Sequence, residues 1–166
     1  GFLMDGILLL EKQKETDHYQ IQSLPINSGV FCLKKDRFQD VVWIGTDGQG
    51  VYLYSNPLYS IKSMVLSNYT EKIERPVRAI YLDDERTFWV GTKGNGILKI
   101  YDYEFDKNIS DCRAEVLTTS NSALSSNAVY CFAKSHRNLL WIGDEEGLTY
   151  YSYREKRIKS IPIRIG

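Results

Sequence analysis

One short run of the chain combines the glycines and oxygen-bearing side chains that phosphate-binding or calcium-binding loops need. It reads Gly45-Thr-Asp-Gly-Gln-Gly50 and is followed by the apolar and aromatic run 51–54. A phosphate-binding P-loop would continue with Lys-Ser or Lys-Thr and a helix. A calcium loop would alternate acidic residues and close on a glutamate, whereas Asp47 stands alone. We therefore expect a tight hairpin turn, in which Gly48 and its counterpart Gly94 adopt positive φ.

Side chains suited to catalysis are few and scattered. The two histidines, His18 and His136, belong to no His-x-x-x-His pair and no Ser-His-Asp set, and we expect both at the surface. The acidic pairs 83–84 and 145–146 lie in turns, where solvated charges are more common than glycosidase carboxylates. The sequence therefore predicts no catalytic residue, no metal site and no cofactor.

The hairpin belongs to a motif that occurs three times. Each copy has a tryptophan, an aliphatic residue, a glycine, and a second glycine four or five residues later. The tryptophans and first glycines of the three copies are Trp43 and Gly45, Trp89 and Gly91, and Trp141 and Gly143. A truncated fourth copy opens the chain, where Gly1 and Gly6 keep the glycine spacing. We expect the tryptophans to pack between repeats and the first glycines to relieve crowding where their strand twists or bulges.

Each repeat has the pattern of four short strands. In the middle repeat these are residues 77–82, 87–91, 96–101 and 114–118, separated by charged or small turn residues. A period of about 45 residues with four strands per unit is typical of a β-propeller blade. The predicted fold is therefore all-β, a propeller segment of four-stranded antiparallel blades. The expected units are residues 1–29, the outer two strands of a preceding blade with a connecting loop, and three blades at 30–76, 77–127 and 128–166.

The first strand of each repeat has a position for a small residue. It is filled by Cys32, Ala79 and Cys131. This alternation suggests small buried side chains and not a redox centre. The cysteines, which include Cys112, are three in number and form no Cys-x-x-Cys pair, so they predict neither a zinc site nor a disulfide framework.

Next to this position, the repeats differ in a way that suggests ligand binding. Phe31, Arg78 and Tyr130 are equivalent, and three residues earlier Ser28, Arg75 and Asn127 are equivalent. Aromatic platforms with arginine and amide donors suit a sugar or an acidic sugar. The predicted ligand-binding residues at the channel mouth are Phe31, Arg75, Arg78, Asn127 and Tyr130. The alternative is that these are ordinary rim residues of a scaffold.

The charge balance excludes two classes of partner. Lysine plus arginine and aspartate plus glutamate each number 21, so the formal net charge is zero. Nucleic acid and anionic membrane surfaces both select for basic proteins, so neither is expected as a partner. No apolar run approaches the roughly 20 residues of a membrane helix, so the sequence predicts no membrane segment.

The repeated motif is similar to a known family of propeller repeats. The run Trp-Ile-Gly-Thr with its two later glycines, preceded by Leu-Ser-Ser-Asn-Ala-Val-Tyr-Cys-Phe at 124–132, resembles the two-component-regulator propeller repeat. That family builds periplasmic sensor regions of hybrid two-component systems in Bacteroidetes, and its ligands are often oligosaccharides. The resemblance covers essentially the whole chain. It implies a periplasmic fragment of about 3.5 blades from a seven-bladed ring. Propellers in general close with about four to eight blades.

Three functions follow from these observations. The first is a non-catalytic sensor segment that detects a glycan-derived small ligand for signal transduction. The second is a protein–protein interaction scaffold or a propeller oligomerisation segment. The third, weaker reading is a fragment of a propeller-fold lyase or hydrolase. More copies of the motif followed by a membrane span and a histidine-kinase core in flanking sequence would favour the first.

The arrangement of strands also predicts how the chain associates. It begins with the third and fourth strands of a blade, at about 6–10 and 18–22, and it ends with the fourth strand of another blade, near 157–163. About three and a half blades cannot close a ring, so both end faces need a cover. We expect the remaining blades of the same propeller or a second copy of the chain to supply it, conceivably as a two-fold pair.

Overall fold

The computed structural model describes residues 6–14, 17–55, 60–64, 75–104, 107 and 111–161. All its regular elements of four or more residues are strands. The first two form a two-stranded antiparallel sheet, β1 (Leu8–Lys12) and β2 (Tyr19–Ser23). Within the described residues, no helix is long and apolar enough to cross a membrane.

Three four-stranded antiparallel sheets follow, each made of consecutive strands in spatial order. We call them blades 1, 2 and 3. Blade 1 consists of β3 (Val30–Lys35), β4 (Val41–Thr46), β5 (Val51–Ser55) and β6 (Ser60–Met64). Blade 2 consists of β7 (Val77–Leu82), β8 (Thr87–Thr92), β9 (Ile97–Tyr101) and β10 (Ala114–Leu117). Blade 3 consists of β11 (Val129–Ser135), β12 (Leu139–Asp144), β13 (Gly147–Ser152) and β14 (Arg157–Ser160).

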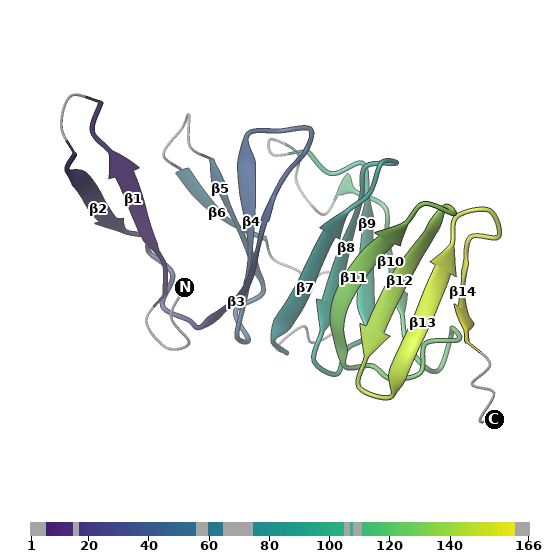
Figure 1. Cartoon of the computed structure of the whole chain (residues 1–166). Coiled ribbons are helices and arrows are strands. Elements are labelled where there is room, and N and C mark those ends of the chain that lie inside the picture. Colours follow the sequence, from purple (N-terminus) through teal and green to yellow (C-terminus); the bar gives the residue numbers. More distant parts are fainter. Residues whose placement is uncertain are drawn as a thin grey trace.

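The sheets stand side by side in chain order, from β1–β2 at one end to blade 3 at the other (Figure 1). This arrangement is a segment of a β-propeller, and the predicted all-β, four-stranded antiparallel fold is confirmed. The strands expected in the middle repeat match β7 to β10 within one residue at each end. The predicted last strand matches β14 as far as Ser160, and its expected end at 163 lies outside the described residues.

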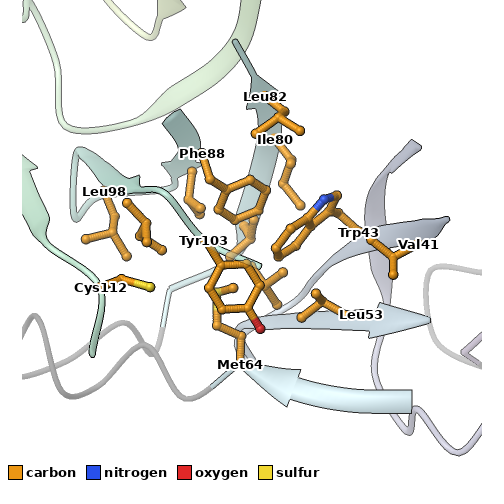
Figure 2. Packing of buried hydrophobic residues seen from close by; sticks show 14 residues of the cluster. Val41, Trp43, Leu53, Met64, Ile80, Leu82, Phe88, Leu98, Tyr103 and Cys112 are labelled. Atoms are coloured by element: carbon orange, nitrogen blue, oxygen red, sulfur yellow. The ribbon is translucent and has the colours of Figure 1, made fainter. Parts of the chain in front are cut away.

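Apolar side chains fill the spaces between the sheets. Blades 1 and 2 enclose the first inter-blade layer, which centres on Trp43, Leu53, Phe88, Leu98 and Tyr103 (Figure 2). Blades 2 and 3 enclose the second inter-blade layer, which includes Trp89, Phe132, Leu140 and Tyr151. A third cluster joins the β1–β2 sheet to blade 1 through Ile7, Leu24, Ile26, Ile44 and Tyr54.

The tryptophans pack as predicted wherever a blade follows them. Trp43 is 1% exposed, and its ring centroid lies 3.8 Å from that of Phe88 in blade 2. Trp89 is fully buried, and its centroid lies 4.8 Å from that of Tyr151 in blade 3. Trp141 is only partly buried and contacts Tyr150 of its own blade, at 5.5 Å.

The turn aspartates are a correction to the sequence-based interpretation. Asp83 was expected to be solvated, but it is 1% exposed. Its carboxylate accepts the indole N–H of Trp89 at 2.9 Å and the backbone N–H of Thr87 at 2.8 Å. Asp36 does the same for Trp43 at 2.8 Å. A buried carboxylate is tolerated here because several N–H groups satisfy it.

The first glycines of the motif relieve a close approach, and the associated bulge lies on the neighbouring strand. The register shifts occur on β3, β7 and β11, directly opposite the glycines on β4, β8 and β12. A Cβ on Gly45 would lie 2.5 Å from Sγ of Cys32 and 2.9 Å from Cγ1 of Val77. The hairpin glycines behave as predicted, with φ of 82° at Gly48 and 116° at Gly94.

The predicted burial of the small residue on the first strand is found in two of the three repeats. Ala79 is buried and Cys32 is partly buried against blade 2, with its Sγ 3.9 Å from the carbonyl oxygen of Val77. Cys131 is exposed, so the expectation of a buried core residue is wrong for it. The reason is positional, because no described sheet covers the outer face of blade 3.

Candidate functional site

The innermost strand of each blade, β3, β7 or β11, has a β-bulge whose extra residue departs from the regular alternation of side chains. Each register shift falls between two paired residues, Val30 and Cys32 on β3, or Val77 and Ala79 on β7. The same shift separates Val129 from Cys131 on β11. The extra residue of a bulge is unpaired, so its side chain is re-aimed away from the regular alternation. The three extra residues are Phe31, Arg78 and Tyr130, the equivalent set singled out in the sequence.

These three side chains, which we call the Arg78 ladder, meet although they come from three blades. The Cζ atom of Arg78 lies 4.8 Å from the ring centroid of Phe31 and 5.3 Å from that of Tyr130. A guanidinium over an aromatic face is stabilised by the ring quadrupole, and the effect grows as water is excluded. Two rings from neighbouring blades therefore hold the cation of the middle blade in place.

The cation of the ladder has no anion beside it in the described part of the chain. No ion pair there includes Arg78, and its Nε is buried without a hydrogen-bond partner. Tyr130 is 38% exposed, so the edge of the ladder is accessible. Guanidinium groups recognise carboxylates and clustered oxygens through their planar donors, and rings contact the apolar faces of sugars.

The other two predicted ligand residues lie apart from the ladder. Arg75 lies near the β8–β9 hairpin, where its Nε is 3.9 Å from the point that a Cβ on Gly94 would occupy. Asn127 has structural bonds, because its carboxamide oxygen accepts the N–H of Thr119 at 2.9 Å. Its backbone carbonyl also accepts the N–H groups of Gly94 and Gly96, both at 2.9 Å. The structure thus brings together Phe31, Arg78 and Tyr130, and places Arg75 and Asn127 at the adjoining hairpin.

A second cluster of functional side chains escaped the sequence-based interpretation. Lys99 on β9 is 3% exposed and lies in the second inter-blade layer. Its Nζ is 4.6 Å from the ring centroid of Trp89, 5.0 Å from that of Tyr101 and 4.5 Å from that of Tyr151. Glu115 on β10 accepts from Nζ at 3.3 Å. The ammonium group is thus enclosed by three rings and one carboxylate.

Burial perturbs the acid–base behaviour of this cluster. Desolvation lowers the pKa of Lys99, and Glu115 partly opposes the change. Desolvation also raises the pKa of Tyr101, with a further increase from the hydrogen bond that its hydroxyl donates to Glu115 at 2.8 Å. Burial raises the pKa of Tyr151 to about 12. Both tyrosines therefore remain protonated donors at neutral pH.

The repeat pattern contained a signal for this cluster. The residue paired with the motif tryptophan on the third strand is Leu53 in blade 1, Lys99 in blade 2 and Tyr150 in blade 3. Two of the three are apolar or aromatic, and Leu53 lies in the layer between blades 1 and 2. A lysine at the same position is the exception, and comparing repeats strand by strand would have found it.

The histidines are exposed and lie apart from both clusters. His18 precedes β2 and His136 follows β11. Within the described residues, no group of three or more His, Cys, Asp or Glu side chains is arranged to hold a metal ion.

Comparison with solved structures places the fold among known extracellular domains. The extracellular domain of BT3049 from B. thetaiotaomicron, described as a hybrid two-component system, matches with a TM-score of 0.63 and 22% identity, covering 95% of this chain and 21% of that one. The extracellular domain of BT4673 from the same organism matches with a TM-score of 0.66 and 18% identity, covering 88% of this chain and 18% of that one. PorZ, a surface component of the type-IX secretion system of Porphyromonas gingivalis, matches with a TM-score of 0.61 and 18% identity, covering 89% of this chain and 22% of that one.

These similarities establish the fold. No protein-family model and no curated protein matches the chain. The chain spans about a fifth of the length of the structures it resembles. The class defined by strand order and comparison is a segment of a β-propeller like those in extracellular domains of bacterial surface proteins.

Proposed function

We propose that this chain is a non-catalytic, ligand-binding segment of a periplasmic sensor propeller that detects a glycan-derived molecule for signal transduction. The similarity to extracellular domains of proteins described as hybrid two-component systems supports the sensor role and the location. The observation that supports ligand binding is the Arg78 ladder. It offers a preoriented guanidinium with no acidic partner among the described residues, flanked by two rings on the inner strands.

The ladder suits a sugar for two reasons. The rings of Phe31 and Tyr130 supply apolar surface for the faces of a pyranose. Arg78 supplies planar donors for hydroxyl or carboxylate oxygens, and its held geometry reduces the entropy lost on binding. Because the three side chains come from three blades, the site depends on how the blades are spaced. Ligand binding therefore couples to blade geometry, as a sensor that shifts between two states requires.

The test is calorimetric titration of the purified chain with maltotriose, cellotriose and trigalacturonate. We expect at least one to bind, and Arg78→Gln to weaken that binding at least tenfold. The matched control is Arg86→Gln, since Arg86 also stacks on a ring, that of Phe38 at 5.3 Å, but lies in the β7–β8 turn. No binding by any of the three, or equal loss in both variants, would contradict the proposal.

A scaffold or oligomerisation role is the second candidate, and one observation favours it. The outer face of the β1–β2 sheet exposes Leu8, Leu10, Tyr19 and Ile21, with Leu10 at 57% and Ile21 at 63%. Exposed apolar clusters of this kind mark contact surfaces. We propose that further blades or a second copy of the chain cover it. Light scattering tests the second copy: a mass twice that of the chain, reduced by Leu10→Glu, supports it, and a monodisperse monomer contradicts it.

A further inference from the structure

The second inter-blade layer has open space beside it. A cavity of about 470 Å³ opens beside the second layer, between β8–β10 of blade 2 and the β13–β14 hairpin of blade 3. A cavity of about 410 Å³ adjoins it and shares Glu115, Tyr151 and Lys156. We call the two together the inter-blade cavity. Its total size is in the range of small-molecule sites, about 300–1,000 Å³.

The innermost charged side chain of the cavity is Lys99. Its counterpart in blade 1 is Leu53, which is fully buried, so an apolar residue fits the same position in this fold. Burying an ammonium group costs free energy that a leucine at this site would not incur. Stability alone therefore does not account for a lysine here, whereas a ligand that uses its N–H groups does.

The hydrogen bonds inside the cluster leave Lys99 with capacity to spare. An ammonium group has three N–H donors. Its neighbours Glu115 Oε2 and the Tyr151 hydroxyl lie at 3.3 and 3.4 Å, which is long for a charge-assisted bond. The same oxygen of Glu115 also accepts from the Tyr101 hydroxyl at 2.8 Å. A third donor of Lys99 thus has no acceptor among these neighbours.

The mouth of the inter-blade cavity carries exposed charges of both signs. Arg113 and Lys156 are the cations, and Glu85 and Asp102 are the anions. None of the four forms an ion pair within the described part of the chain. Arg113 is held by stacking, with its Cζ 4.1 Å from the ring centroid of Tyr101.

The charges of the lining cancel, and this selects the kind of ligand. With Lys99 and Glu115 included, three basic and three acidic side chains line the larger of the two cavities. The adjoining cavity adds Arg157, whose charge is paired with Glu155 at 2.7 Å. A lining with no net charge gives an ionic ligand little overall attraction. Adjacent basic and acidic side chains instead match neighbouring hydroxyl groups, because each hydroxyl both accepts and donates a hydrogen bond.

We infer that the inter-blade cavity is a second binding site, for an uncharged polyhydroxylated molecule the size of a monosaccharide or disaccharide. Lys99 and the Tyr151 hydroxyl contact it at the floor, and Arg113, Lys156 and Glu85 contact it at the mouth. The site is separate from the Arg78 ladder, because its residues come from β8–β10, β13, β14 and turns, and none comes from the inner strands β3, β7 and β11. It therefore does not depend on the proposed ligand of the channel side.

Saturation-transfer NMR on the purified chain tests the inference, with glucose, galactose and mannose as neutral probes. Glucuronate and alanine serve as anionic and zwitterionic probes. We expect saturation transfer to at least one neutral sugar, and at least a tenfold loss of affinity in Lys99→Met and in Lys156→Gln. Lys156 is exposed in a turn, so its variant retains the fold even if the Lys99 variant does not. The matched control is Leu53→Met, at the equivalent position of blade 1, which should leave affinity unchanged.

The outcomes separate this site from the ladder. Neutral-sugar binding that survives Arg78→Gln but not Lys156→Gln supports the inference, whatever happens at the channel side. Binding lost in Arg78→Gln and kept in Lys156→Gln overturns it and leaves the proposed function standing. Saturation transfer to glucuronate or alanine alone, or to none of the probes, also overturns the inference.

Discussion

The first and second inter-blade layers are built from the same repeat and have different contents. The buried cluster of the first is apolar, with Trp43 packed against Phe88 and Leu53 buried beside it (Figure 2). The second keeps the tryptophan, as Trp89, but places Lys99 where the first has Leu53. The first layer is a packed core, whereas the second has a charge at its centre and the inter-blade cavity beside it.

This difference shows which positions of the repeat are fixed by packing. The tryptophan, its turn aspartate and the glycine opposite the bulge recur in blades 1 and 2, because each contacts the next blade or supports a residue that does. The position paired with the tryptophan tolerates change, and its chemistry decides whether the layer is closed or open. Function can thus be introduced in one layer without disturbing the framework.

Truncating the tryptophans is expected to give the largest effects. Trp43→Ala and Trp89→Ala should each lower the free energy of unfolding by about 3–5 kcal/mol, the usual cost of a large buried aromatic. Trp141→Ala should cost clearly less, because Trp141 is partly buried and contacts only its own blade among the ring contacts found. Chemical denaturation of the three variants checks the order, and equal losses would show that coverage by a following blade does not matter.

Adding a methyl group at the motif glycines should follow the same order with smaller effects. Gly45→Ala and Gly91→Ala place a Cβ within 3 Å of a valine methyl in the next blade, and overpacking of this kind costs about 1–3 kcal/mol. In Gly143→Ala, the nearest atom is Sγ of the exposed Cys131, which can move aside. Melting temperatures should fall for the first two variants and change little for the third. A fall as large for Gly143→Ala would contradict this.

The reactivity of the two equivalent cysteines, Cys32 and Cys131, should also depend on whether a following blade covers them. Burial raises the pKa of Cys32 from 9.0 to about 11, whereas Cys131 is exposed. At pH 8, a thiol reagent should label Cys131 quickly and Cys32 slowly, as intact mass and peptide mapping would show. Because the folded state holds the Cys32 proton, this group's contribution to stability is full below pH 9 and is lost as pH rises through 11. Cys32→Ala should not show that component of alkaline loss, and an identical pH profile would contradict the assignment.

Much of the fold was predictable because the repeat fixes it. The spacing of Trp43, Trp89 and Trp141, with glycines following, indicated four-stranded blades. The equivalence of Phe31, Arg78 and Tyr130 placed them at corresponding positions of neighbouring blades, and the structure adds that their side chains meet. Both depend on local order along the chain, which a single sequence records. Their role in binding stays a prediction.

What the sequence did not reveal depends on neighbours in space. The charge of Asp83 suggested solvent, but a tryptophan six residues later buries it. Cys131 had the pattern of a core residue, but the face it lies on is uncovered by any described sheet. Nothing next to Lys99 in the sequence indicates its burial, because Tyr151, which lies beside it, is 52 residues away. In each case, burial is set by a blade or turn that the local pattern does not identify.

If Leu53 serves the stability of the first layer and Lys99 serves binding in the second, a reciprocal exchange of the two residue types should affect stability unequally. Chemical denaturation would measure the free energy of unfolding of Leu53→Lys and Lys99→Leu. We expect a loss of about 3–5 kcal/mol for Leu53→Lys, which buries an unpaired charge. We expect a change within about 1 kcal/mol, or a gain, for Lys99→Leu, because an apolar residue replaces a buried ion. Equal and large losses in both variants would show instead that Lys99 serves the stability of its layer.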